Sequence, residues 1–180
     1  YPGELDIVIA VGPSKDRTRE VAQAIEAANS HVHVVDNPTG KTPSGLNAAI
    51  ARTTSDIVVR IDGHAMVPSD YVRTGVLTLQ ATGADNVGGV MAAEGTTDFE
   101  RTVARAMTSK FGVGGASFHV GGEAGPALTV YLGCFQRSAL RRVGGYDESM
   151  QRAQDWEMNL RIRQTGGVVW FTPDMRVTYR

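Results

Sequence analysis

The architecture can be inferred from one stretch, Asp56–Pro68, which reads Asp-Ile-Val-Val-Arg-Ile-Asp-Gly-His-Ala-Met-Val-Pro. Its β-branched run is long enough for a strand and too short for most helices. The run stops at Asp62-Gly63-His64, where an acid, a backbone-permissive glycine and an imidazole stand together. Ligands of open α/β sheets bind beyond the carboxyl ends of the strands, and carboxylate and imidazole groups both bind divalent metals. The alternative is a plain strand and turn, with Asp62 and Gly63 as turn residues.

Strands and helices alternate around this stretch. Strands are predicted at Leu5–Val11 and His33–Val35, and the strand at Asp56–His64 is the third. The helix between the first two strands is expected to bury an apolar stripe made of Val21, Ala22, Ile25 and Ala28. Strands that alternate with helices predict an α/β fold with a mostly parallel central sheet flanked by helices.

The second half of the chain is predicted to contain further strands, helices and one long loop. A capping box at Thr97–Glu100 opens a helix, and the glycine-rich stretch Gly112–Gly125 is predicted to be a mobile loop. The remaining predicted elements are strands at Asn86–Ala93, Leu128–Phe135, Val168–Thr172 and Met175–Tyr179, and helices at Arg137–Val143 and Arg152–Thr165.

Length and composition narrow the possible functions. A chain of 180 residues suits one domain with its own core. The net charge of -1, with scattered basic residues, argues against a nucleic-acid partner. The single cysteine, Cys134, excludes an internal disulfide, fits a reducing compartment and is predicted to be a buried apolar residue. No apolar run approaches the roughly 20 residues of a membrane span. Neither end resembles a natural terminus, so a fragment is expected.

Lys41 lies in Gly40-Lys41-Thr42-Pro43, which invites comparison with a phosphate-binding P-loop. That motif requires a glycine five residues before its Gly-Lys-Thr, and Val35 stands there instead. The comparison therefore fails. Lys41 is either a solvated surface lysine or a phosphate contact of another kind.

The stretch Gln154-Asp155-Trp156-Glu157 lies near the start of a predicted helix. Residues two apart on a helix point in nearly opposite directions, so Asp155 and Glu157 cannot act as one acid pair. Glu157 is expected to form an ion pair with Arg161, four residues on. Taken alone, Asp155 is explained as a favourable charge in the first turn of a helix.

Taken in order, these motifs resemble a family of enzymes. The order is a strand that ends in Asp62-Gly63-His64, a glycine-rich loop, and then Gly144–Glu148, Gln154–Arg161 and Val169–Asp174. Together they resemble the family 2 glycosyltransferases of the GT-A fold, and most closely their bacterial exopolysaccharide branch, which includes the succinoglycan glucosyltransferases. The resemblance covers almost the whole chain. It implies one catalytic domain, with residues 1–93 as the nucleotide-sugar half and 94–180 as the acceptor half.

The resemblance implies a role for particular positions. Asp62, with the neighbouring Gly63, matches the family's Asp-x-Asp motif, which holds a divalent metal, Mn²⁺ or Mg²⁺, and the donor diphosphate. Asp155 matches the general base, which implies inversion at the anomeric carbon. The positions implied near the two substrates are Lys41 and Asn47 for the nucleotide, and Gln154 and Trp156 for the acceptor.

The chain also departs from the family pattern. His64 stands where the second Asp is usual, and imidazole suits Mn²⁺ better than Mg²⁺. The family's first strand is expected ahead of Tyr1, in sequence outside the printed chain. The whole protein is expected at the cytoplasmic face of the membrane, which it would contact only through other segments. Two alternatives stay open: a non-catalytic nucleotide- or carbohydrate-binding domain, and a nucleotide-hydrolysing or nucleotidyl-transferring enzyme that uses Lys41.

Overall fold

The structure, a computed structural model, describes residues 1–93, 97–98, 102, 118 and 121–179. The predicted helix after Thr97 and most of the predicted loop at Gly112–Gly125 lie outside these residues. Among the described residues, no helix is both long enough and apolar enough to cross a membrane.

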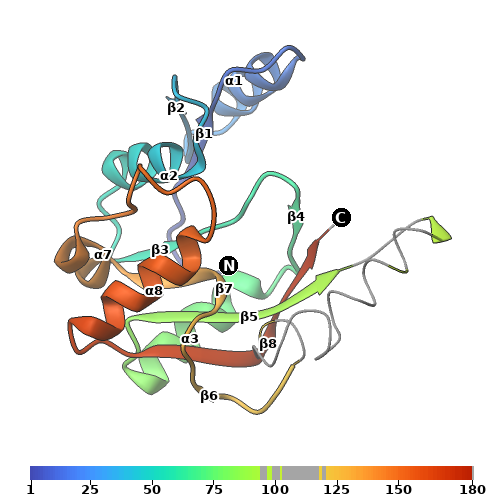
Figure 1. Ribbon diagram of the computed structural model, residues 1–180. Coiled ribbons are helices and arrows are strands. Elements are labelled where there is room, and N and C mark those ends of the chain that lie inside the picture. The colour runs from blue at the N-terminus through green and yellow to red at the C-terminus, as the bar shows by residue number, and fades with distance from the viewer. Residues whose placement is uncertain (94–96, 99–101, 103–117, 119–120, 180) are drawn as a thin grey trace.

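A six-stranded sheet forms the centre of the described fold, in the order β3-β7-β5-β8-β4 with β6 beside β8 (Figure 1). Its strands are β3 (Ile57–Val59), β4 (Ala65–Met66), β5 (Asn86–Ala93), β6 (Gly125–Pro126), β7 (Tyr131–Gln136) and β8 (Val169–Tyr179). Only β5 and β8 pair in parallel, and the other pairings in this sheet are antiparallel. The sheet is therefore mixed, and the prediction of a mostly parallel sheet was wrong on this point. The reason is β7, which comes from the second half of the chain and inserts antiparallel between β3 and β5.

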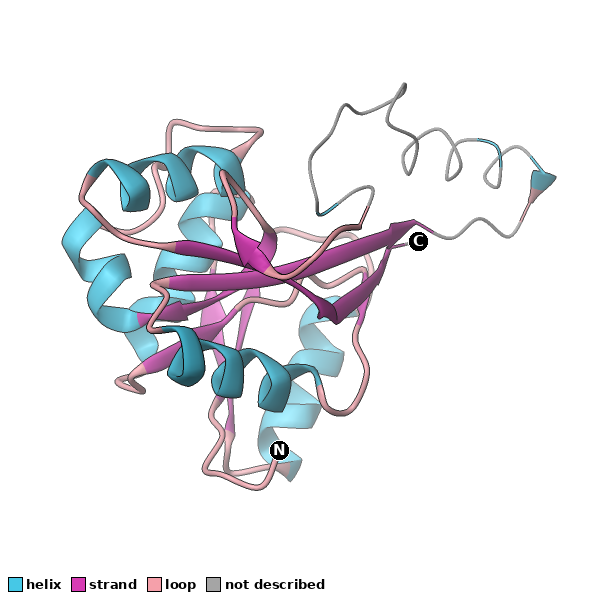
Figure 2. Ribbon diagram, turned by 90° about the horizontal axis from the view of Figure 1, so that it is seen from below, coloured by secondary structure: helices cyan, strands magenta, loops and turns pink. Residues whose placement is uncertain are grey.

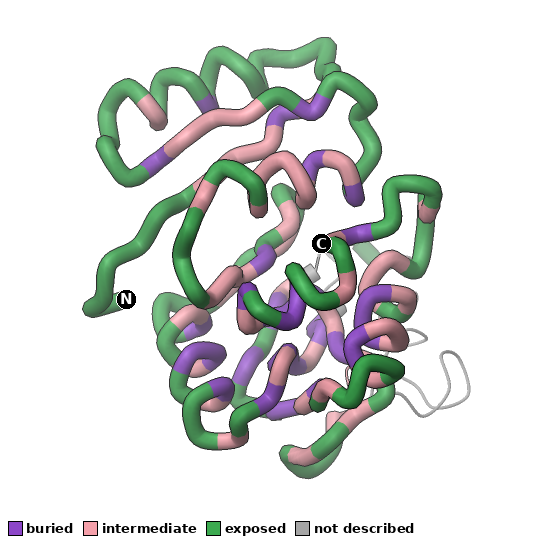
Figure 3. The backbone as a smooth tube through the Cα atoms, turned by 90° about the vertical axis from the view of Figure 1, so that its left-hand side faces the viewer, coloured by how far each residue is buried: buried purple, intermediate pink, exposed green. Residues whose placement is uncertain are grey.

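A smaller parallel sheet carries the first part of the chain. It consists of β1 (Ile7–Val11) and β2 (Val32–Asp36), with α1 (Thr18–Ala28) and α2 (Thr42–Arg52) beside them (Figure 1). Of the stripe predicted on α1, only Ala22 is buried, while Val21 and Ile25 are 50% and 42% exposed. Figure 3 shows that burial is concentrated in the larger sheet and its helices.

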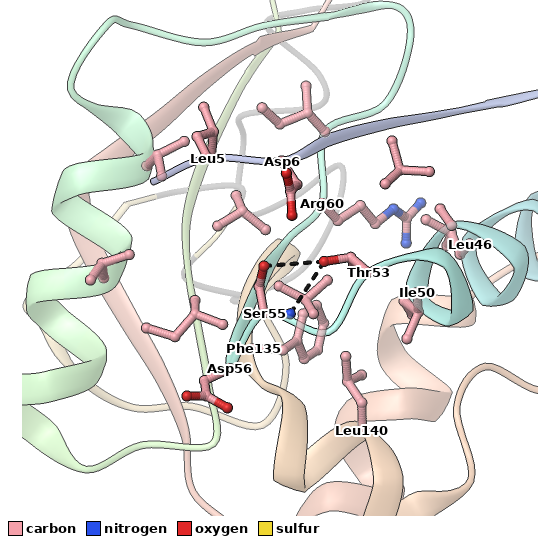
Figure 4. Close-up of a pocket in the computed structure, with 18 of the residues that line it drawn as sticks. Leu5, Asp6, Leu46, Ile50, Thr53, Ser55, Asp56, Arg60, Phe135 and Leu140 are labelled. Carbon is pink, nitrogen blue, oxygen red and sulfur yellow. Dashed lines mark hydrogen bonds between the residues drawn. The ribbon is translucent and has the colours of Figure 1, made fainter. Parts of the chain in front are cut away.

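A groove separates the two sheets. In the described part of the chain, β1 pairs only with β2 and β3 pairs only with β7, so each leaves one edge without a strand partner. The groove has a volume of about 350 Å³. Figure 4 shows Leu5 and Asp6 along one side, with Leu46 and Ile50 of α2 nearby.

Helices cover both faces of the larger sheet (Figure 2). On one face, α3 (Tyr71–Thr82) packs Tyr71 and Leu79 into a buried cluster with β7 and β8 residues. On the other face, α7 (Arg137–Val143) and α8 (Gln154–Gln164) supply Leu140, Met158 and Ile162 to a second cluster. Cys134 is buried in the first cluster, as the sequence predicts. The sheet between the two clusters is thus a rigid support for residues at its edges.

Among the element boundaries that differ from the sequence-based prediction, two concern strands of the larger sheet. The strand predicted over Asp56–His64 is regular only at Ile57–Val59, and a turn follows in which Ala65 N donates to Asp62 O at 2.9 Å. The two strands predicted around Pro173 are one strand, β8, whose pairing with β5 shifts register between Gly88 and Val90. This irregularity lets a proline stay within the strand, as is usual for proline at a bulge.

Candidate active site

A buried arginine brings the two predicted acids together. Arg60, which is 7% exposed, follows β3 directly. Its Nε donates to Asp62 Oδ1 at 2.8 Å and its Nη2 to Asp62 Oδ2 at 3.1 Å. Its Nη1 donates to Oδ1 of Asp155, which lies 95 positions later in the first turn of α8. The end of β3 and the start of α8 therefore form one polar site.

The backbone around Asp155 is specialised to present its carboxylate. Ala153, immediately before α8, has a φ of 59°, and so does Leu132 on β7. Non-glycine residues rarely adopt this left-handed conformation, and it is often found at functional sites. The Leu132 N–H donates to Asp155 Oδ2 at 3.3 Å. Each carboxylate oxygen of Asp155 thus has one donor from the protein.

Burial and the charge of Arg60 shift the pKa of Asp155 in opposite directions. Its side chain is 22% exposed. Burial raises the pKa of Asp155 above its ordinary value, Arg60 opposes this rise, and the nearby Asp62 charge adds to it. A carboxylate with a raised pKa accepts a proton more readily, as a general base requires. Although burial alone would lower the pKa of Arg60, the two acids raise it overall, so Arg60 stays protonated.

Tyr146 forms a wall of the site beside Arg60. The guanidinium carbon lies 5.7 Å from the centre of the Tyr146 ring, a cation–π distance. Asn47 on α2 holds the backbone of Tyr146, because Asn47 Nδ2 donates to Tyr146 O and Tyr146 N donates to Asn47 Oδ1. Both ends of the Asn47 amide are therefore bonded within the protein. Its implied contact with the nucleotide stays a prediction.

A larger pocket of about 780 Å³ opens beside Asp62. Its polar wall combines the turn after β3 with the ends of β1 and β2, and it includes Gly12, Asn37, Gly40, Thr42, Asp62, Gly63 and His64. Asn37 is buried, and its Nδ2 donates to Lys41 O at 2.9 Å. A Cβ on Gly45 would lie 2.7 Å from this nitrogen, so glycine is needed there. Asn37 was not singled out from the sequence, although a polar residue directly after a strand could have indicated it.

Lys41 lies at the edge of this pocket. It precedes α2 directly, is exposed, and lies between two residues that line the pocket, Gly40 and Thr42.

The residues predicted near the acceptor lie on α8. Trp156, 51% exposed, is next to Asp155. Gln154 donates through Nε2 to Gln151 O at 3.1 Å. The predicted ion pair forms, with Arg161 Nη2 donating to Glu157 Oε2 at 2.7 Å.

The residues at the turn after β3 fit a metal that a substrate helps to bind. Within the described residues, no group of three or more His, Cys, Asp or Glu could hold a metal. Asp62 and His64 nevertheless lie two residues apart on the wall of one pocket. Divalent ions at nucleotide sites often have only one or two protein carboxylates and take other ligands from phosphates. A metal held by these two side chains would need a diphosphate to complete its coordination.

The fold is that of the GT-A glycosyltransferases. The mannosyltransferase PcManGT from Pyrobaculum calidifontis, solved with GDP-Man and Mn²⁺, matches with a TM-score of 0.70 and 21% identity, over 97% of this chain and 47% of that one. GalNAc-T7, solved with UDP, GalNAc and Mn²⁺, matches with a TM-score of 0.69 and 14% identity, over 97% of this chain and 37% of that one. Two structures with low identity thus share one architecture with this chain.

Sequence comparison gives the family. Residues 1–144 match the model of glycosyl transferase family 2, and the chain belongs to that family. It is 34% identical over 175 residues to the succinoglycan biosynthesis protein ExoA of Rhizobium meliloti (strain 1021). That match covers 96% of this chain and 53% of the relative, so the chain spans about half the length of the curated relative. The resemblance to family 2 inferred from the motifs is confirmed.

Proposed function

We propose that this chain carries the catalytic site of an inverting glycosyltransferase. The enzyme moves a sugar from a nucleotide-sugar donor to a glycan or lipid-linked acceptor in bacterial polysaccharide synthesis. The observation that carries the proposal is the joining of Asp62 and Asp155 through Arg60, because it brings the acid proposed for the diphosphate side close to the proposed base. Family membership and the likeness to a succinoglycan biosynthesis protein support it.

Asp155 acts as the general base. Its carboxylate accepts the proton of an acceptor hydroxyl, and the hydroxyl oxygen forms a bond to the anomeric carbon of the donor sugar. The bond from that carbon to the donor phosphate breaks, and a nucleoside diphosphate leaves with the electron pair. A single in-line displacement without an enzyme nucleophile inverts the anomeric configuration. The raised pKa of Asp155 suits the proton transfer.

Asp62 and His64 hold the divalent metal of this proposal. When bound, such an ion stabilises the negative charge that develops on the leaving diphosphate. Two structural neighbours solved with Mn²⁺ and nucleotide ligands support this assignment. Because His64 supplies a nitrogen, Mn²⁺ fits the pair better than Mg²⁺.

The remaining proposed roles follow the two sides of the site. Residues 1–93 form the donor half, in which Gly63, Lys41 and Asn47 lie toward the nucleotide. Residues 94–180 form the acceptor half, in which Gln154 and the exposed indole of Trp156 meet the acceptor. An exposed aromatic face beside the base is suited to packing on a sugar ring. The whole protein works at the cytoplasmic face of the membrane in this proposal.

The test compares Asp155→Asn and Asp62→Asn with Asp70→Asn, an exposed acid outside the pocket lining. Membranes with lipid-linked acceptor and a radiolabelled nucleotide sugar report transfer, and NMR of the product reports its anomeric configuration. We expect Asp155→Asn to lower kcat by roughly 10²- to 10⁴-fold, the usual contribution of a general base. Asp70→Asn should retain activity. Full activity of Asp155→Asn, or retention of configuration, would overturn the proposal.

A further inference from the structure

Arg60 has a position that the proposed chemistry does not yet use. Its side chain is 6% exposed, so it has little surface left for a substrate. It nevertheless provides three of its five N–H groups to two carboxylates, Asp62 and Asp155. A buried guanidinium is costly to desolvate unless its partners are well placed. A buried arginine at this point therefore calls for a role beyond filling space.

We propose that Arg60 is a positioning residue for the transfer reaction: it uses Asp62 as an anchor to hold the Asp155 carboxylate in place. The inference rests on the proposed role of Asp155 as the base. Arg60 itself touches neither reacting atom. Its effect on the reaction passes through Asp155.

The geometry of the fork supports this role. Two nitrogens of Arg60, Nε and Nη2, face the two oxygens of Asp62, which fixes the plane of the guanidinium. The remaining nitrogen, Nη1, then points at Asp155 Oδ1. Leu132 N–H fixes the other oxygen. The carboxylate of Asp155 is thus held at both ends, and each oxygen keeps a lone pair for an acceptor hydroxyl.

A lysine cannot reproduce this arrangement. An ammonium group is a point charge on a flexible stem, whereas the guanidinium is a planar fork that can satisfy a bidentate and a second partner at once. Arg60→Lys therefore keeps the positive charge and removes the planar fork that orients the Asp155 carboxylate. This makes it a selective test of positioning.

Arg137 offers a matched control. It is a buried arginine like Arg60, 6% exposed, but it donates to the backbone carbonyls of Ser55 and Ile50. Arg137→Lys should reduce stability without reaching the site. A comparison of the two variants separates loss of stability from loss of positioning.

The experiment measures kcat, the donor KM and the equilibrium Kd for nucleotide in both variants. The nucleotide is UDP, GDP or dTDP, whichever binds the unaltered protein. For Arg60→Lys we expect kcat to fall about 10²-fold, since a small misplacement of a catalytic group costs about that much. The nucleotide Kd should change less than about threefold, and Arg137→Lys should leave both values unchanged. Arg60→Gln, planar but uncharged, gives the same test if the lysine variant does not fold.

A double variant places the effect at Asp155. Because Arg60 acts through that carboxylate, adding Arg60→Lys to Asp155→Asn should lower the residual rate no further. A tenfold weaker nucleotide Kd with unchanged kcat in Arg60→Lys would overturn the inference, since Arg60 would then bind the donor. Equal losses in Arg60→Lys and Arg137→Lys would overturn it too. If Asp155→Asn is inactive while Arg60→Lys is normal, only this inference fails; an active Asp155→Asn refutes the proposed base itself.

Discussion

Asn47 and Tyr146 exchange two hydrogen bonds, both of 2.8 Å, between the side chain of one residue and the backbone of the other. The bonds join α2 of the first half of the chain to the turn after α7. Asn47 Nδ2 also lies 2.9 Å from Glu148 Oε1. The pair therefore fixes the wall of the site against which Arg60 lies.

We predict that Asn47→Ala lowers the free energy of unfolding by about 1–3 kcal/mol, because it leaves partly buried backbone groups of Tyr146 without partners. Chemical denaturation measures this directly. Calorimetry of the folded variant tests the implied nucleotide role as well: a purely structural Asn47 leaves the nucleotide Kd nearly unchanged. An unchanged stability with a much weaker Kd would show that Asn47 binds the donor.

Asp155 should make the protein less stable as its carboxylate ionises. Its pKa is raised in the folded state, mainly by burial, so the folded protein binds this proton more tightly than the unfolded chain does. The stabilising effect is complete below the ordinary aspartate pKa of about 4 and is lost as pH rises through the raised folded value. Asp155→Asn has no carboxyl group to ionise at this position, so its stability relative to the unaltered protein should rise as pH rises from about 4 to 7.

The measurement is chemical denaturation of Asp155→Asn and Asp70→Asn across the same pH range. The stability of Asp155→Asn relative to the unaltered protein should fall as pH falls toward 4, while Asp70→Asn should show no such trend. A relative stability of Asp155→Asn that does not change between pH 4 and pH 7 would contradict the raised pKa.

At Gly89 the backbone of β8 lies too close to β5 to leave room for a side chain. A Cβ at this position would lie 1.7 Å from Met175 O, at the irregular pairing of β5 and β8. We predict that Gly89→Ala either fails to fold or loses more than about 4 kcal/mol of stability, since backbone cannot give way as a side chain can. Gly125→Ala is the control, because its Cβ would meet nothing within 4 Å. Similar melting temperatures for both variants would refute this account of the irregularity.

Much of the site could be predicted because its parts are local in sequence. Asp62 ends a recognisable β-branched run, and Asp155 opens a recognisable helix. Family resemblance assigned both roles, and the structure brings both residues to one arginine. Arg60 was missed, although a charged residue within an apolar run is a signal. Such a residue needs a partner when buried, and that partner lies 95 positions away, where no local pattern shows it.

The pairing of the sheet could not be predicted for a related reason. Alternation of strands and helices gives the order of the elements along the chain, but it does not show that β7 inserts between β3 and β5. The stripe on α1 shows a second limit. Val21 and Ile25 have the spacing of a buried face, yet whether such a face is covered depends on what packs there, and both are substantially exposed.

The most direct test of the central claim is a calorimetric titration of UDP, GDP and dTDP, with and without Mn²⁺, against the unaltered protein and Asp62→Ala. The site as proposed predicts that one nucleotide binds only in the presence of Mn²⁺ and that Asp62→Ala abolishes this binding. Nucleotide binding that needs no Mn²⁺ and survives Asp62→Ala would contradict the claim that Asp62 holds the metal and the donor diphosphate.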